Sequence, residues 1–198
     1  MKKAHVLLFD GYADWELGNV LAELRRLGEV DVVTIGFSDK SVVSMGGLHV
    51  KPDMVLAQVN LKDILVFILP GGYMWEGSYP KAEIDQFLNR LEEEAIPIAA
   101  ICAATTVLAR AGLFQGRRHT SNSMKYLSKM VPEYSEHSNY VNSLSTRDRH
   151  VITASGLGPV EFTMEVLSEL NLSSPEMRSI WFEAFKRGKY PDDVERSV

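Results

Sequence analysis

The feature that most constrains this chain is a short apolar run that turns directly into a helical pattern. Residues 97–101 read Pro-Ile-Ala-Ala-Ile, which is typical of a short buried strand. After three small residues at 102–104, apolar residues recur at helical spacing as far as Gly112, a C-terminal stop signal. A strand that passes straight into a helix places its turn residue at the helix N-terminus, where backbone N–H groups favour negative charge.

Cys102 occupies this turn and is the only cysteine among the 198 residues. A thiol at a helix N-terminus is expected to ionise more readily than an isolated one, and the thiolate is the reactive form. The small neighbours fit a sharp turn of the nucleophile-elbow kind, although the Gly-x-Ser-x-Gly signature is absent. The alternative is a small buried hydrophobic residue, which is the commoner role of a lone cysteine.

Strand and helix signals alternate along the rest of the chain. Apolar runs predict strands, and apolar residues spaced three and four apart predict helices. Strands are expected at 4–9, 30–35, 64–69, 117–120, 140–144 and 150–153, with a hairpin at 42–50 and a short helix or loop at 53–60. Helices are expected at 13–27, 81–94, 121–130 (with Ser121 as its cap), from 159 onward and at 175–187. This alternation predicts a single α/β domain with a mostly parallel sheet covered on both faces.

In such a sheet, sites form beyond the carboxyl ends of the strands, where the strand order switches. The expected loops at this edge are residues 10–16, 70–73 and 102–104. Three loops that are distant in sequence are therefore predicted to share one rim.

Composition excludes several function classes. The net charge is −5 without a basic block, which disfavours a nucleic-acid partner, and no apolar window is long enough for a membrane span. One cysteine excludes an intrachain disulfide and favours a reducing, cytoplasmic setting. No metal is expected because no Cys/His cluster occurs, and no cofactor is expected because no Gly-x-Gly-x-x-Gly follows the first strand.

Several segments, taken together, resemble the ThiJ/PfpI family of class I glutamine amidotransferase-like proteins. They follow the family's order and fall on the predicted loops. They are DWE at 14–16, LPGG at 69–72, AICA at 100–103, LARAGL at 108–113 and TASGLGP at 153–159, followed by Glu161-Phe162.

The resemblance implies a flavodoxin-like three-layer sandwich with Cys102 as the elbow nucleophile. Glu16 matches the family's carboxylate that hydrogen-bonds this thiol, which requires that one partner carry a proton because two anions in contact repel. Gly71 or Gly72 and Ala103 match backbone donors of an oxyanion hole. From the residues alone, Glu16 also fits a solvated acid at a helix start, and the Pro-Gly-Gly segment an ordinary turn.

The chain departs from the family at the assisting histidine. Hydrolytic members have a histidine directly after the nucleophile, where this chain has Ala103. The branch typified by the human parkinsonism protein has a later histidine, whose counterpart here is Asn122. His119 is therefore the best substitute for an assisting histidine, and the alternative is that it only packs in the core.

Two function classes stay open. In the first, Cys102 attacks a small carbonyl or amide substrate while Glu16 moves protons, as in glyoxalase, deglycase or amidase-like family members. The missing histidine disfavours peptide hydrolysis. Tyr73 and Trp75 either wall the pocket, or cap an edge of the core, or make subunit contacts, and the sequence leaves these roles open. In the second, the protein is a non-catalytic redox sensor or stress-response protein that uses oxidation of Cys102. The resemblance also implies a homodimer.

Overall fold

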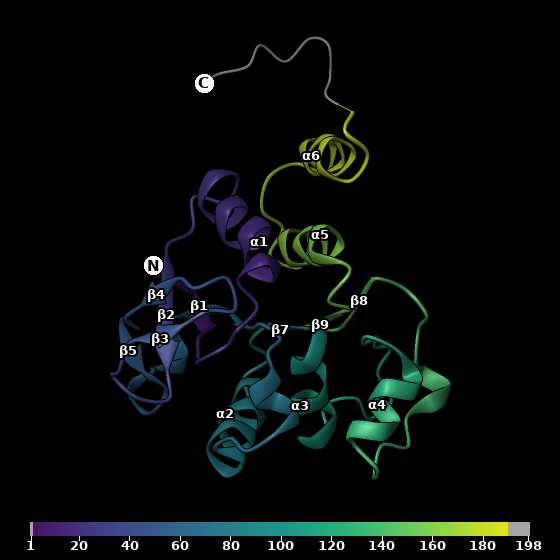
Figure 1. Cartoon of the computed structure of the whole chain (residues 1–198). Helices are drawn as coiled ribbons and strands as arrows, with labels where there is room; N and C mark the ends of the chain where they lie inside the picture. Colours follow the sequence, from purple (N-terminus) through teal and green to yellow (C-terminus); the bar gives the residue numbers. More distant parts are fainter. Residues whose placement is uncertain (1, 190–198) are drawn as a thin grey trace.

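The computed structural model describes residues 2–189, in which seven strands form one central sheet (Figure 1). The strand order is β5-β2-β1-β6-β7-β9-β8, and β8 is the one strand of this sheet that runs antiparallel to its neighbour. The bounds are β1 (Lys3–Leu7), β2 (Val32–Gly36), β5 (Met54–Val55), β6 (Ile64–Leu69), β7 (Ile98–Ile101), β8 (Ser145–Asp148) and β9 (Val151–Ala154). The predicted flavodoxin-like α/β class is confirmed.

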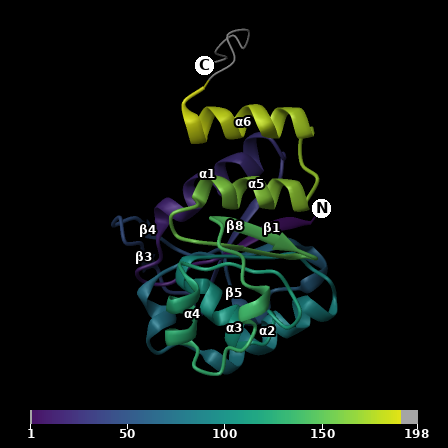
Figure 2. The ribbon, with the colours of Figure 1, turned by 90° about the vertical axis from the view of Figure 1, so that its right-hand side faces the viewer.

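Helices cover both faces of the sheet (Figures 1 and 2). One face carries α1 (Asp14–Arg26) and α5 (Pro159–Glu169), and α6 (Pro175–Arg187) packs on the outside of α5. The other face carries α2 (Lys81–Glu93), α3 (Thr105–Arg110) and α4 (Met124–Met130). Short 3₁₀ turns are η1 (Leu56–Gln58), η2 (Leu61–Asp63), η3 (Tyr73–Glu76), η4 (Cys102–Ala104) and η5 (His137–Asn139), and the hairpin is β3 (Val42–Val43) with β4 (His49–Val50).

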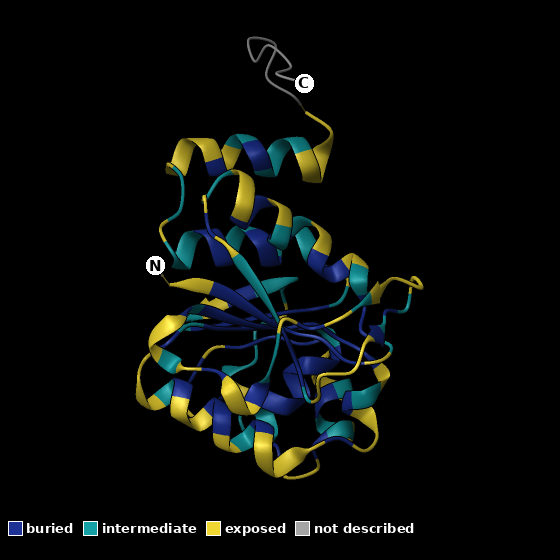
Figure 3. Cartoon of the chain, turned by 90° about the vertical axis from the view of Figure 1, so that its left-hand side faces the viewer, coloured by how far each residue is buried: buried dark blue, intermediate teal, exposed yellow. Residues whose placement is uncertain are grey.

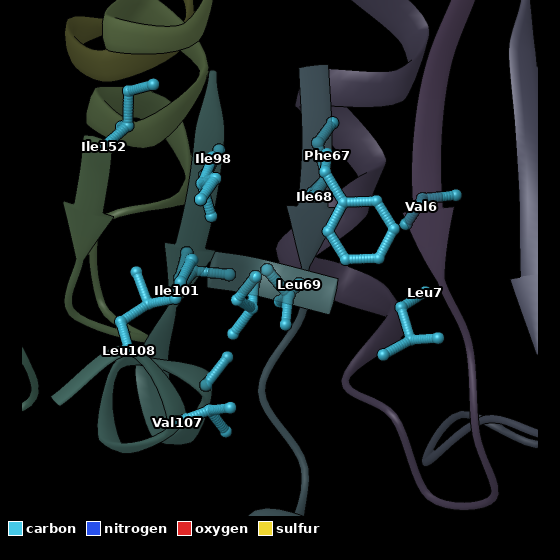
Figure 4. Packing of buried hydrophobic residues seen from close by; sticks show 14 of the residues in the cluster. Val6, Leu7, Phe67, Ile68, Leu69, Ile98, Ile101, Val107, Leu108 and Ile152 are labelled. Atoms are coloured by element: carbon cyan, nitrogen blue, oxygen red, sulfur yellow. The ribbon is translucent and has the colours of Figure 1, made fainter. Parts of the chain in front are cut away.

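The core follows from the apolar runs of the central strands. In a parallel sheet covered on both faces, both sides of each strand must be apolar, and β6 and β7 are buried along nearly their whole length (Figure 3). Figure 4 shows Leu69 and Ile101 of the sheet beside Val107 and Leu108 of α3. The helix that follows Cys102 is thus held against the sheet by its apolar face.

Several predicted elements differ from the structure. The segment 53–60 contains the edge strand β5 before η1, and only one residue of 117–120, His119, forms a bridge, with Tyr140. The strand expected at 140–144 lies instead at 145–148. Arg147 stabilises this polar edge strand through ion pairs with Glu165 and Glu169 of α5.

The helix expected at 121–130 begins later, at Met124. Ser123 is its cap, because its Oγ accepts a hydrogen bond from the Tyr126 amide at 2.9 Å. The predicted cap, Ser121, instead shares a 2.7 Å hydrogen bond with the hydroxyl of Thr105 on α3. The side chain therefore ties the loop to α3 rather than starting a helix.

The strand order reverses between β1 and β6. The chain proceeds from β1 through β2 to β5 on one side, and from β6 through β7 to β9 on the other. The loops that leave β1, β6, β7 and β9 meet at the carboxyl edge beside this switch, as the sequence predicted for the first three. Within residues 2–189, no helix has the length and hydrophobicity that crossing a bilayer requires.

Candidate active site

Cys102 lies at the end of β7, where the backbone turns sharply. Its φ of +60° is left-handed, an uncommon conformation for a residue with a side chain. Such strain persists only where the surroundings fix it. One contact that fixes it is the Thr105 hydroxyl, which donates to the Cys102 carbonyl oxygen at 2.6 Å. The turn holds the thiol half-buried at the edge of the sheet.

Glu16 comes to the same point from the first turn of α1. Its side chain is fully buried, and its Oε2 accepts a hydrogen bond from the Gly71 amide at 2.6 Å. The other oxygen, Oε1, has no nitrogen or oxygen partner within the described chain and faces the thiol of Cys102. A methyl group added to Gly156 would lie 2.9 Å from Sγ and 3.1 Å from Oε1, so the two atoms share one small space.

Glycines at two positions create that space. A Cβ at Gly71 would lie 2.7 Å from the Cβ of Cys102 and 2.8 Å from Glu16 Oε2. These distances are shorter than side chains tolerate, so any larger residue at Gly71 or Gly156 would displace the acid or the thiol. The fourth loop, which follows β9, was not placed at the rim by the sequence pattern, although its Ser-Gly-Leu-Gly segment was one of the matching motifs.

Asn122 completes the contacts of the sulfur. Its Nδ2 donates to Cys102 Sγ at 3.3 Å, and its Oδ1 accepts from the Gly156 amide at 2.9 Å. The residue that matches the family's histidine position therefore does reach the thiol, but as an amide that cannot take up or release a proton in the physiological range.

His119 is engaged elsewhere. Its two ring nitrogens hydrogen-bond the Arg117 carbonyl oxygen at 2.7 Å and the Tyr134 hydroxyl at 2.6 Å. The ring is fully buried and stacks on Phe114 with 4.1 Å between centroids. The structure thus gives His119 packing contacts, and in the described chain no hydrogen bond joins it to Cys102.

The protonation of the two facing groups is set mainly by burial. Burial raises the pKa of Glu16 to about 7, although the Gly71 amide acts in the opposite direction. Burial, reinforced by the negative charge of Glu16, raises the pKa of Cys102 to about 11. The expectation of an easily ionised thiol is therefore wrong, because desolvation outweighs the short, six-residue helix α3 behind it.

The predicted oxyanion donors differ in availability. The Gly71 amide is already bonded to Glu16, so it does not point toward a substrate. The Gly72 amide donates to no acceptor within residues 2–189, and the Ala103 N–H points at the sulfur and lowers the pKa of Cys102. Of the two glycines, Gly72 is therefore the one whose amide has no partner within residues 2–189, and Ala103 is the backbone donor that contacts the thiol.

The two aromatic residues after the Gly-Gly turn, Tyr73 and Trp75, differ in burial. Trp75 is fully buried and donates through Nε1 to the Pro70 carbonyl oxygen at 2.8 Å, so it belongs to the core and does not wall a pocket. Tyr73 is 77% exposed at the rim. Within residues 2–189, no group of three or more His, Cys, Asp or Glu side chains could hold a metal ion.

Comparison with known proteins identifies the family of the chain. The family model described as DJ-1/PfpI family matches residues 2–169. The chain belongs to the DJ-1/PfpI family. It is 32% identical to the uncharacterized protease YoaZ of Bacillus subtilis over 95% of this chain and 92% of that protein. The crystal structure of the thiJ/pfpI family protein from Bacillus anthracis matches with a TM-score of 0.87, at 33% identity over 95% of this chain and 92% of that chain.

Other relatives in the family carry names of different activities. The deglycase TK1284 of Thermococcus kodakarensis is 27% identical over 60% of this chain and 71% of that protein. These names fit cysteine-dependent chemistry in general, but they differ between protease and deglycase.

Proposed function

We propose that the protein is an enzyme in which Cys102 attacks a small carbonyl or amide substrate and Glu16 is the general base. The observation that carries the proposal is a buried carboxyl group, with a pKa raised to about 7, facing a cysteine sulfur. A general base works best when its pKa lies near the working pH. The thiol itself, with a pKa of about 11, needs such a base because it is not ionised at neutral pH.

The proposed first step forms a bond between Sγ and the carbonyl carbon. The thiol proton moves to Glu16, and the π-electron pair of the carbonyl moves to its oxygen. The Gly72 and Ala103 amides would donate to that oxyanion, and Asn122 would keep the sulfur in place. Glu16 can later return the proton, which suits aldehydes and dicarbonyl compounds that have no amine to expel.

The test is lactate formation from methylglyoxal by the wild-type protein and by Cys102→Ser. We expect turnover in the wild type and its loss in the variant. A His119→Gln variant serves as the matched control, because its buried contacts predict a stability change without loss of the thiol chemistry. Absence of turnover with methylglyoxal and with other small aldehydes, in a correctly folded protein, would contradict the proposal.

Redox sensing by the same residue is the second candidate, and the contacts of the sulfur support it. Asn122 Nδ2 and the Ala103 N–H could both donate to a sulfinate oxygen, and a protonated Glu16 could do the same. Intact mass after mild peroxide treatment tests this function. A stable gain of about 32 Da, from two added oxygens, without turnover would favour the sensor.

We further propose a homodimer that buries the apolar residues beside the start of α1. Trp15 is 55% exposed and Leu48, in the hairpin, is 57% exposed. The hairpin is fixed against α1 because the Ser44 hydroxyl donates to Asp14 at 2.7 Å. Light scattering should give a dimer for the wild type and a monomer for Trp15→Glu, whereas Phe185→Glu on α6 should stay dimeric. A monomeric wild type would contradict this proposal.

A further inference from the structure

Two segments leave the candidate active site and meet again four residues further along each of them. Gly72 leads into η3, which packs directly against η4 and ends at Glu76. Asn122 leads into α4, in whose first turn Tyr126 lies. The Tyr126 hydroxyl donates to Glu76 Oε1 at 2.7 Å, so one hydrogen bond joins the two segments, each four positions beyond a residue of the site.

The two segments are anchored to α3, the helix behind Cys102. Arg110 of α3 donates through Nη1 to the Trp75 carbonyl oxygen at 3.1 Å and through Nη2 to the Met130 carbonyl oxygen at 2.9 Å. Because Trp75 directly precedes Glu76 and Met130 ends α4, this guanidinium fixes the spacing of the pair. The carboxylate of Glu76 is therefore held at a defined place.

The pair is electrostatically coupled to the sulfur. Burial, the Glu76 carboxylate and a negative charge on Cys102 all raise the pKa of Tyr126, which puts its hydroxyl within reach of the field of the thiolate. Glu76 is exposed, and within residues 2–189 no cation forms an ion pair with it. Arg110, the cation beside Tyr126, is occupied by carbonyl oxygens and by the Tyr79 hydroxyl.

We propose that Glu76, oriented by Tyr126, is a specificity determinant that admits uncharged electrophiles to Cys102 and repels anionic ones. The substrate class is then a neutral aldehyde or dicarbonyl compound, and oxoacids are excluded. This inference rests on the proposed function only in taking Cys102 as the reacting atom. Glu76 acts on the approach of the substrate and not on bond making.

The test compares alkylation of Cys102 by iodoacetamide, which is neutral, with alkylation by iodoacetate, which is anionic and of similar size. In both reactions a bond from Sγ to carbon forms, the carbon–iodine bond breaks, and the thiol proton is lost. Glu76→Gln keeps a carbonyl oxygen that can accept from Tyr126 but removes the charge. We expect the ratio of the iodoacetate rate to the iodoacetamide rate to rise about fivefold, the order of effect of removing one unit charge near a partly screened site.

Two variants sharpen the result. Glu94→Gln changes the net charge equally but lies beside Lys2 at the opposite edge of the sheet, so its ratio should equal that of the wild type. Tyr126→Phe keeps the charge but releases the carboxylate, so its ratio should move toward that of Glu76→Gln. A ratio unchanged in Glu76→Gln overturns the charge filter alone. A Cys102 that reacts with neither reagent overturns the nucleophile and the filter together.

Discussion

At the scale of single residues, the proposed chemistry depends on proton transfer between a buried acid and a half-buried thiol. Glu16 has no exposed surface, and one of its oxygens has no partner among residues 2–189, which is costly for a charged group. The Gly71 amide offsets only part of this cost, because it donates to one of the two oxygens. The same burial that destabilises the carboxylate moves its pKa to about 7, where it can act as a base.

The stability of a Glu16→Gln variant should therefore depend on pH. Below pH 4.5, the usual pKa of this carboxyl group, Glu16 is protonated in both the folded and the unfolded wild-type chain. The variant and the wild type should then unfold with equal free energies. Between pH 4.5 and 7 the unfolded wild-type chain ionises this carboxyl group while the folded chain keeps it protonated, so the variant should become more stable than the wild type by about 3 kcal/mol, a difference that stays constant above pH 7. Urea unfolding at pH 4 and pH 8.5 measures this difference, with Glu94→Gln as the exposed control. A variant less stable than the wild type at pH 8.5 would argue against the assigned burial cost.

The same substitution should change the titration of Cys102. Without the negative charge of Glu16, one cause of the raised thiol pKa disappears, so thiolate absorbance should develop at lower pH than the wild-type value of about 11. The rate of alkylation should also lose its inflection near pH 7, because the base that gives that inflection is gone. An inflection retained in Glu16→Gln would assign it to another group.

At the scale of elements, the site is a meeting of four loops at the carboxyl edge of a parallel sheet. Each loop supplies one part: the acid at the start of α1, a backbone amide after β6, the thiol after β7 and a glycine after β9. Asn122 links the last two loops, because its side chain hydrogen-bonds both the sulfur of Cys102 and the Gly156 amide. The geometry of the site therefore depends on the close approach of the β7 and β9 loops.

Gly156→Ala tests that approach. Its new methyl group would lie 2.9 Å from Sγ, so we expect the alkylation rate of Cys102 to change at least about tenfold as the thiol is displaced. Gly77→Ala is the matched control, since its nearest neighbours are 3.8 Å away, and its rate should equal that of the wild type. Rates of iodoacetamide labelling of Cys102, measured by mass spectrometry, show whether the substitution displaces the thiol. Equal rates for the Gly156 variant and wild type would mean that the loop moves aside without disturbing the thiol.

At the scale of the whole molecule, the active edge and the outermost helix are separate parts. The helix α6 packs mainly on α5, and the ribbon view places it outside the α1–α5 layer (Figure 2). Trp181 anchors it, with 3% of its surface exposed and a stack on Phe185 at 5.0 Å. The site loops lie on the sheet itself, so damage to α6 should not reach them.

Trp181→Ala should accordingly lower the free energy of unfolding by about 3 kcal/mol, the usual cost of removing a buried aromatic ring, without changing Cys102 labelling. Phe185→Ala is the matched control because half of that ring is exposed and less packing is lost. Thermal unfolding and labelling rates, measured on the same samples, separate the two effects. Slower or faster labelling in Trp181→Ala would show that α6 and the site are coupled.

Sequence patterns predicted the regular elements of this chain well where packing is dictated by local hydrophobicity. The bounds of β6 and of α6 agree with the predicted 64–69 and 175–187. Prediction failed where polar residues form an edge strand, as at Arg147 in β8. Ion pairs of Arg147 hold this strand against α5, so the strand lacks the apolar pattern from which strands are predicted. It also failed at Ser121 and Ser123, because either serine could cap a helix and only the neighbouring Thr105 distinguishes them.

The sequence by itself determined the α/β class, the loops at the carboxyl edge and the candidate pair of Cys102 and Glu16. These follow from the spacing of apolar residues and from matching motifs, which are local properties of the chain. The tertiary structure alone decided that burial raises the pKa of the thiol, that Asn122 rather than His119 contacts it, and that the Gly71 amide is bonded to Glu16. Each of these depends on burial and on partners from distant segments, and a linear sequence encodes neither until the sheet brings the segments together.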